Sequence, residues 1–217
     1  MQIAIGLYPE FTALDAIGPY QVLTNVPGVE VVVCAEQKGR LPDDNGLLVF
    51  DIAHTFDDVP NPDILLVPGG IITRKVARDG GPIVDWIRSA HETTQLTTSV
   101  CTGALLLGAA GVLEGKTATT HWIAYDALAG YGATPTEQRV VRDGKVVTAA
   151  GVSAGIDLAL TLVGELYGDD TAKAIQLGIE YDPQPPYDAG APSKAPAEIK
   201  DLVSGLMRAA EQDLLAR

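Results

Sequence analysis

Short β-type runs alternate with helical patterns along most of the chain, and this alternation constrains the fold more than any other feature. Four runs rich in apolar or β-branched residues are predicted as strands: Ile3–Tyr8, Val29–Cys34, Ile64–Val67 and Leu96–Val100. Strands that are separated by helices form right-handed βαβ units and lie parallel in one sheet. Because such a sheet is covered by helices on both faces, its strands are continuously apolar, as several of these are.

The pattern predicts a three-layer α/β/α sandwich with a mainly parallel sheet. A chain of 217 residues, 47% of them apolar, is long enough to bury a substantial core as one domain. Near the end of the sheet-forming part, Arg139–Val141 and Lys145–Val147 flank the pair Asp143-Gly144, a strong hairpin signal. Helices are predicted over Asp15–Asn25, Pro82–Glu92, Thr102–Ala110, Trp122–Ala129, Ala154–Tyr167 and Thr171–Glu180.

The composition changes after these helices. Residues 181–195 are rich in proline and therefore form neither a helix nor a central strand. We expect one domain over residues 1–217 in which this segment is an extended arm, followed by a terminal helix at 196–217. Such an arm either wraps its own domain or crosses to a partner subunit.

Charge and motif content exclude several classes of protein. The chain has 15 basic and 28 acidic residues, a formal charge of −13, which argues against nucleic acid and anionic membrane as partners. We see no signal peptide and no membrane span, so we expect a cytoplasmic protein. Its two cysteines make no disulfide framework or zinc site, and no phosphate-binding glycine loop occurs, so no cofactor or metal is expected.

The sharpest local feature surrounds Cys101. A β-type run ends at this cysteine, and a helical segment that starts with the small residues Thr102-Gly103-Ala104 follows at once. This is the layout of a nucleophile elbow, which holds a strained, exposed nucleophile at the carboxyl end of a sheet, where ligands bind. Cys101 is therefore the candidate nucleophile, the alternative being a buried core cysteine. Cys34, at an ordinary strand end, is assigned to the core.

Activating Cys101 requires more than its place on a helix. Lowering a thiol pKa from about 8.5 to about 6 needs about 3.4 kcal/mol, whereas a helix N-terminus supplies up to about 2 kcal/mol. Direct hydrogen bonds to the sulfur must supply the rest. The glycines that end the third strand allow close approach of backbone amides, and the amides of Gly70 and Thr102 are candidates for an anion hole.

Asp15 is the only ionisable residue between Phe11 and Tyr20. From periodicity alone it is interpreted as an ordinary helix N-cap.

Together, Cys101 at the elbow, the Pro68-Gly69-Gly70 turn and an acidic residue after the first strand resemble the ThiJ/PfpI superfamily. The segments Ser99–Gly103 and Ala118–Trp122 are similar to a branch of it that contains isonitrile hydratases and AraC-type regulators. The arm is similar to that of isonitrile hydratases, and the resemblance covers nearly the whole chain. Because one helix follows the arm and the charge is acidic, we expect no helix-turn-helix module.

The resemblance implies a flavodoxin-like fold, a homodimer and a small-molecule isonitrile substrate, R–NC, which is hydrated to an N-substituted formamide. In this interpretation Cys101 attacks the isonitrile carbon and forms a covalent thioimidate, and Asp15 carries protons. Thr102 orients the water or the nitrogen. Gly70 and Ile71 contribute to the substrate site.

Two other functions fit the same residues. An exposed, low-pKa thiol beside an acid also suits a redox sensor or stress-protective protein. A related hydrolase or glyoxalase-like enzyme would use Cys101 on a carbonyl group. Peptidase-like members of the superfamily carry histidine directly after the cysteine, where this chain has Thr102. A Cys–His peptidase mechanism would therefore lack its general base at this position. His121 is the remaining candidate for one.

Overall fold

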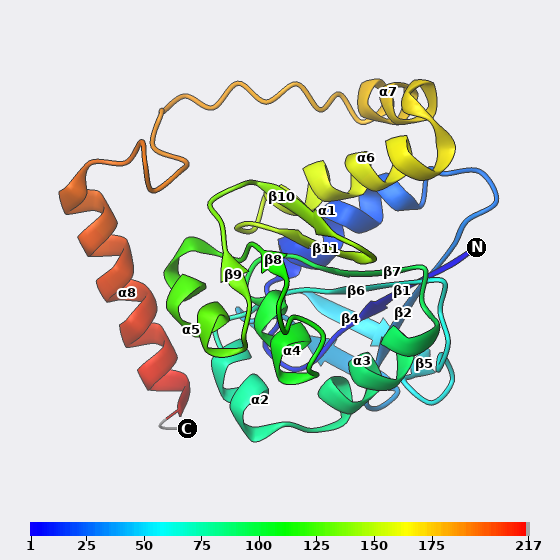
Figure 1. Cartoon of the computed structure of the whole chain (residues 1–217), viewed down its shortest axis with the longest axis horizontal. Coiled ribbons are helices and arrows are strands. Elements are labelled where there is room, and N and C mark those ends of the chain that lie inside the picture. The colour runs from blue at the N-terminus through cyan, green and yellow to red at the C-terminus, as the bar shows by residue number, and fades with distance from the viewer. Residues whose placement is uncertain (216–217) are drawn as a thin grey trace.

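A seven-stranded sheet forms the centre of the computed structural model, which describes residues 1–215 (Figure 1). Its strand order is β10-β11-β7-β6-β1-β2-β5. The strands are β1 Gln2–Gly6, β2 Glu30–Ala35, β5 His54–Thr55, β6 Ile64–Val67, β7 Leu96–Ser99, β10 Val140–Asp143 and β11 Val146–Ala149. All pair parallel except β10, which forms the predicted hairpin with β11. The mainly parallel sheet is thus confirmed.

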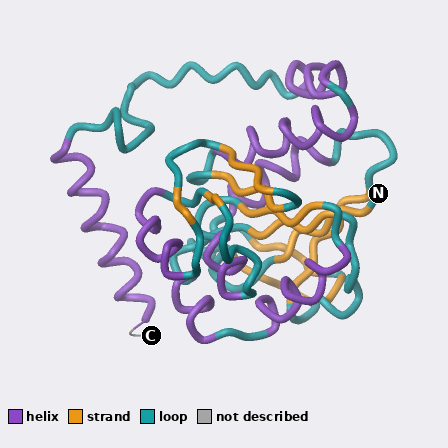
Figure 2. Tube along the Cα trace, in the orientation of Figure 1, coloured by secondary structure: helices purple, strands orange, loops and turns teal. Residues whose placement is uncertain are grey.

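Helices cover both faces of the sheet and complete the predicted sandwich (Figures 1 and 2). One face is covered by α1 (Ala13–Leu23) and α6 (Ala154–Tyr167), and α7 (Asp169–Gly178) packs beside α6. The other face is covered by the helices α2 Thr73–Asp79, α3 Pro82–Thr93, α4 Gly103–Ala109 and α5 Tyr125–Gly130.

The core lies along the middle of the sheet. Every residue of β6 and β7 is buried, and so are Gly103–Gly108 of α4. Packing here is close: a Cβ added at Gly6 would lie 2.5 Å from the Trp86 ring, so β1 and α3 meet through a glycine. Strand β1 lies between β2 and β6, so from β1 the chain continues to β2 on one side and later returns to β6 on the other. Sheets with such a reversal of strand order bind ligands at this point, outside the carboxyl ends of the strands.

Some local predictions were wrong. The helix predicted over Trp122–Ala129 starts as a 3₁₀ turn, η1 (Trp122–Ala124), before α5 begins, because His121 Nδ1 accepts the Ile123 N–H and tightens that turn. Helix α2 was not predicted. Two small two-stranded sheets stand outside the main one; their strands are β3 Gly39–Pro42 with β4 Val49–Ile52, and β8 Thr117–Ala118 with β9 Thr134–Pro135.

After α7 the chain has no regular secondary structure up to the last helix, α8 (Ala197–Leu215), which lies along the side of the body (Figure 1). The arm predicted as extended over 181–195 ends in a turn, where the amides of Lys194 and Ala195 donate to the Ala191 carbonyl. Tyr181 anchors the start of this segment by donating to Asp157 Oδ2 at 3.1 Å. The terminal helix was predicted over 196–217, and its last two residues lie outside the described part. Among residues 1–215, no helix is long and apolar enough to cross a membrane.

Candidate active site

Cys101 lies at the sharp turn between β7 and α4 and has a left-handed backbone, with φ of 56°. A non-glycine residue is strained in this region and is held there by its surroundings. Its N–H donates to the Ala150 carbonyl at 2.8 Å, and its carbonyl accepts from Thr120 Oγ1 at 2.8 Å. Hydrogen bonds from two other segments therefore fix the turn, which is the geometry of a nucleophile elbow.

The expected exposure of Cys101 was wrong. The residue is only 5% exposed. Burial, with Asp15 as the second cause, raises the pKa of the Cys101 thiol well above its usual value, although the backbone amide of Thr102 opposes this. In the resting protein the sulfur therefore keeps its proton, contrary to the lowered pKa expected for an elbow cysteine.

Asp15 faces this sulfur from α1. The N-cap of α1 is Thr12, so the N-cap interpretation of Asp15 was wrong. Its carboxylate instead reaches across the sheet edge, where Oδ2 accepts the Gly69 N–H at 2.8 Å and the thiol of Cys101 also donates to the carboxylate. Oδ1 is buried and has no partner among the described residues. Burial raises the pKa of Asp15 from 3.8 to about 7, even though the Gly69 amide and the thiol act to lower it.

The two groups form a coupled pair that holds a proton between sulfur and carboxyl. The thiol holds this proton in the resting state, and a carboxyl with a pKa of about 7 exchanges it readily at neutral pH. The pair can therefore release the proton from sulfur as a bond to sulfur forms.

The glycine turn after β6 brings the site together. A Cβ at Gly69 would lie 2.5 Å from Thr102 Oγ1 and 2.9 Å from Asp15 Oδ2, so only glycine lets these side chains meet. The next amide, Gly70 N–H, donates to Thr102 Oγ1 at 3.0 Å. The expected anion hole is therefore wrong in one half: the Gly70 amide already has a partner, whereas the Thr102 amide faces the sulfur.

Thr102 belongs to a chain of buried hydroxyl groups that the sequence did not indicate. Thr73 Oγ1 donates to the Gly70 carbonyl at 2.6 Å and lies 2.9 Å from Thr102 Oγ1 and 2.8 Å from the Tyr8 hydroxyl. Burial raises the pKa of Tyr8 well above its usual value, so its hydroxyl stays protonated and donates. This chain uses the donor of Thr102 and thereby fixes its side chain beside the sulfur.

A cavity of 620 Å³ opens next to the pair. Cys101, Thr102, Gly70 and Ile71 line it, which unites four of the five predicted site residues; Asp15 lies behind the sulfur rather than on the cavity wall. The other walls come from α2, the 121–126 segment, Val152 and α8. No group of three His, Cys, Asp or Glu side chains within residues 1–215 is placed to hold a metal ion.

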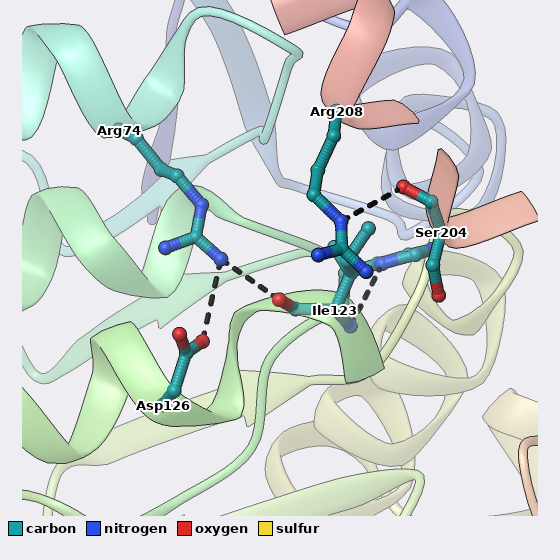
Figure 3. Close-up of polar contacts among 6 residues, drawn as sticks. Arg74, Ile123, Asp126, Ser204 and Arg208 are labelled. Carbon is teal, nitrogen blue, oxygen red and sulfur yellow. Dashed lines mark hydrogen bonds and ion pairs between the residues drawn. The ribbon is translucent and has the colours of Figure 1, made fainter. Parts of the chain in front are cut away.

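Charged side chains mark the side of the cavity nearest α8. Figure 3 shows Arg74 of α2 donating to the Ile123 carbonyl at 2.8 Å, with Asp126 at 3.4 Å, while Arg208 reaches in from α8. Arg208 Nε donates to the Ser204 carbonyl of its own helix at 3.2 Å. None of these residues was predicted, since nothing in the local pattern shows that α8 lies beside the cavity.

The raised pKa of Asp15 predicts a pH-dependent stability. The folded state binds the proton of the Asp15 carboxyl more tightly than the unfolded chain does. The stabilisation of the folded state by this protonation is therefore complete below about pH 4 and is lost as the pH rises to about 7. The loss is of the order of 4 kcal/mol at 1.36 kcal/mol per pKa unit. We therefore expect the unfolding free energy of Asp15→Asn, relative to wild type, to increase over this range in urea titrations.

Asp85→Asn serves as the control, because the Asp85 side chain is 71% exposed on α3. Because an exposed ion pair such as that of Asp85 with Arg88 contributes at most about 1 kcal/mol, the difference of this control from wild type should change far less between pH 4 and 7 than that of Asp15→Asn. An equally small change for Asp15→Asn would show that the Asp15 carboxyl is not held in its protonated form.

Comparison with known proteins gives a family match and a relative that is similar over most of the chain. The model of the DJ-1/PfpI family matches residues 1–165. An isonitrile hydratase of Pseudomonas putida is 45% identical over 201 residues, which is 93% of this chain and 87% of the relative.

Solved structures agree on the fold. A ThiJ/PfpI family protein from Pseudomonas syringae superposes with a TM-score of 0.92 at 37% identity, covering 97% of this chain and 87% of that one. Drosophila melanogaster DJ-1beta shares the fold with a TM-score of 0.73 at 20% identity, over 82% and 97% of the two chains.

Proposed function

The chain belongs to the DJ-1/PfpI family, and from this we propose that it is an isonitrile hydratase that converts R–NC and water into an N-substituted formamide. The observation that carries the proposal is the pairing of Cys101 with a buried carboxyl of raised pKa at the edge of a cavity sized for a small organic molecule. Similarity to the P. putida isonitrile hydratase over most of the chain supports the choice of substrate class.

The first half of the reaction fits the resting protonation of the pair. The isonitrile carbon has to gain both a sulfur and a hydrogen. As Sγ of Cys101 bonds to this carbon, the thiol proton passes to Asp15 and from there to the same carbon, which leaves the thioimidate R–N=CH–S–Cys. No stable thiolate is needed beforehand, so the raised pKa of the buried thiol is compatible with this role.

In the second half, water adds to the thioimidate carbon. One proton of the water reaches the nitrogen through Asp15, which gives R–NH–CH(OH)–S–Cys. The hydroxyl proton then returns to sulfur as the C–S bond breaks, releasing R–NH–CHO and the free thiol. Thr102 stabilises the developing charge on sulfur through its backbone amide, while its hydroxyl holds the glycine turn in place.

The burial of Cys101 argues against a redox sensor, because sensor cysteines combine a low pKa with an accessible sulfur.

We propose a cytoplasmic location, where thiols are kept reduced.

The test is a panel of alkyl and aryl isonitriles incubated with the purified protein, with formamide measured by liquid chromatography and mass spectrometry. Formamide should appear with many turnovers per protein molecule. A protein that forms no formamide from any of the panel, while Cys101 remains a free thiol, would refute the proposal.

We also propose that the protein is a homodimer. The apolar residues Ile199, Leu202 and Leu206 form a stripe on the outer side of α8 and are 45%, 57% and 62% exposed. Side chains at this spacing share one helix face, and an exposed apolar face of this kind usually marks a contact.

Sedimentation equilibrium should therefore give twice the chain mass of 22.7 kDa. The double variant Leu202→Glu with Leu206→Glu is expected to weaken association. Exposed Lys173→Glu on α7 is the charge control. A stable wild-type monomer at micromolar concentration would contradict the proposal.

A further inference from the structure

Among the titratable side chains of the cavity that have no role in the steps above, His121 is the one joined to the segments that hold the nucleophile. His121 lies directly before η1 and lines the same cavity as Cys101 and Thr102. Its neighbour Thr120 donates to the Cys101 carbonyl at 2.8 Å. On the other side, Cys101 donates to Ala150, and a Cβ on the following residue, Gly151, would lie 2.9 Å from His121 Cδ2. Both segments that hold the nucleophile therefore also adjoin His121.

The hydrogen-bond partner of His121 decides which ring nitrogen carries the hydrogen. Nδ1 accepts the Ile123 N–H at 3.4 Å, so in the neutral ring the hydrogen is on Nε2. Burial lowers the pKa of His121, which keeps the ring neutral at physiological pH. The neutral ring, which lines the cavity, therefore carries a hydrogen-bond donor, Nε2–H, rather than a base.

The second half of the proposed reaction needs such a donor. An isonitrile nitrogen has no lone pair, but the thioimidate nitrogen has one, and the carbon becomes more electrophilic when that lone pair is hydrogen-bonded. While water adds, Asp15 accepts a proton from it, so Asp15 cannot at the same moment donate a hydrogen bond to the nitrogen. A donor for the nitrogen has to come from another part of the cavity wall.

We propose that His121 is a catalytic residue whose Nε2–H donates a hydrogen bond to the nitrogen of the covalent thioimidate, so that water adds to the adjacent carbon. This inference rests on the proposed function and assigns its second half-reaction. His121 keeps its own proton throughout. The nitrogen acquires the proton that comes from the attacking water by way of Asp15, and no further reactant is required. Neutral imidazoles with a fixed tautomer serve as donors of this kind in other enzymes.

The experiment follows the adduct on Cys101 by intact-protein mass spectrometry during turnover of an isonitrile that wild type converts. In His121→Leu, formation of the thioimidate should continue while its hydrolysis slows, so the adduct accumulates. Loss of one such donor typically reduces kcat by about 10²–10³-fold. The rate at which iodoacetamide alkylates Cys101 should change by less than about twofold, because this reaction forms no thioimidate nitrogen for His121 to bind.

Two amide variants separate donation from packing. His121→Gln places its amide near the position of Nε2 and should restore much of the hydrolysis rate. His121→Asn places its amide near Nδ1 and should accumulate adduct like leucine. His54→Leu, at an exposed position on β5, is the control and should match wild type.

The outcomes are distinct. Near-normal hydrolysis of the thioimidate in His121→Leu and His121→Asn would overturn the inference. It would also be overturned if adduct formation, thioimidate hydrolysis and alkylation of Cys101 were slowed equally in the Leu, Gln and Asn variants. Should leucine prevent folding, the comparison of Gln with Asn decides in the same way. Absence of formamide with wild type would instead overturn the proposed function itself.

Discussion

Replacing Cys101 with alanine is expected to abolish formamide production. The sulfur forms the only covalent bond that the proposed mechanism makes to the isonitrile carbon, and no other described side chain in the cavity supplies a thiol. Removing a nucleophile of this kind lowers kcat by several powers of ten, and we expect a loss of at least about 10⁴-fold. Product formation under single-turnover and steady-state conditions measures the effect.

The matched control is Cys34→Ser. Cys34 is fully buried in β2, and its thiol donates to the Ile5 carbonyl, a bond that serine can reproduce. Most of the activity should remain, with a moderate loss of stability from burying a more polar group. In wild type, digestion after a rapid quench should place the substrate-derived mass on the peptide that contains Cys101. Full activity in Cys101→Ala would refute covalent catalysis.

Asp15→Asn should lower turnover by about 10²–10⁴-fold, the usual contribution of a general acid or base. Asparagine has the same shape: its carbonyl can accept the Gly69 N–H, and its amide can donate to the sulfur. What it lacks is a proton that can move between sulfur, carbon and nitrogen. Isonitrile turnover should therefore fall, while the rate of iodoacetamide alkylation, measured above pH 8, should be affected much less.

Asp15→Glu separates chemistry from position. It keeps the carboxyl but moves it by about one methylene, and a displacement of about 1 Å can cost about 100-fold. A partial loss is expected. If Asp15→Asn retained near-normal turnover, Asp15 would have no part in proton transfer, and only its structural bond to Gly69 would explain its position.

Six of the seven strands of the main sheet were predictable because their signals are local; the two-residue β5 was not predicted. Parallel strands buried on both faces are continuously apolar over a few residues, as Ile64–Val67 is, and the hairpin depends on Asp143-Gly144. The elbow at Cys101 was also visible, since a strand that ends at a cysteine before small helical residues is a local pattern. Helix α2 was missed, because its seven residues show no clear apolar periodicity of their own.

The site was predictable in its members but not in its electrostatics. Asp15, Gly70, Thr102 and Cys101 follow three different strands, and a parallel sheet brings the carboxyl ends of its strands to one edge. The exposure and pKa of Cys101 could not be predicted, because they depend on how deeply the folded chain buries the sulfur and on the carboxyl of Asp15 beside it. The resting proton on sulfur is a consequence of that burial and of Asp15.

The sequence alone determined the α/β sandwich, the elbow and the family resemblance, since each depends on residue types at short, fixed spacings. Only the tertiary structure decided what lies around the site: the Tyr8–Thr73–Thr102 hydroxyl chain, and the places of His121 and α8 on the cavity wall. These groups lie up to about a hundred residues from Cys101 in the chain, and hydrogen bonding and burial depend on distances in space. No local pattern encodes those distances, so they emerge only when the chain has folded.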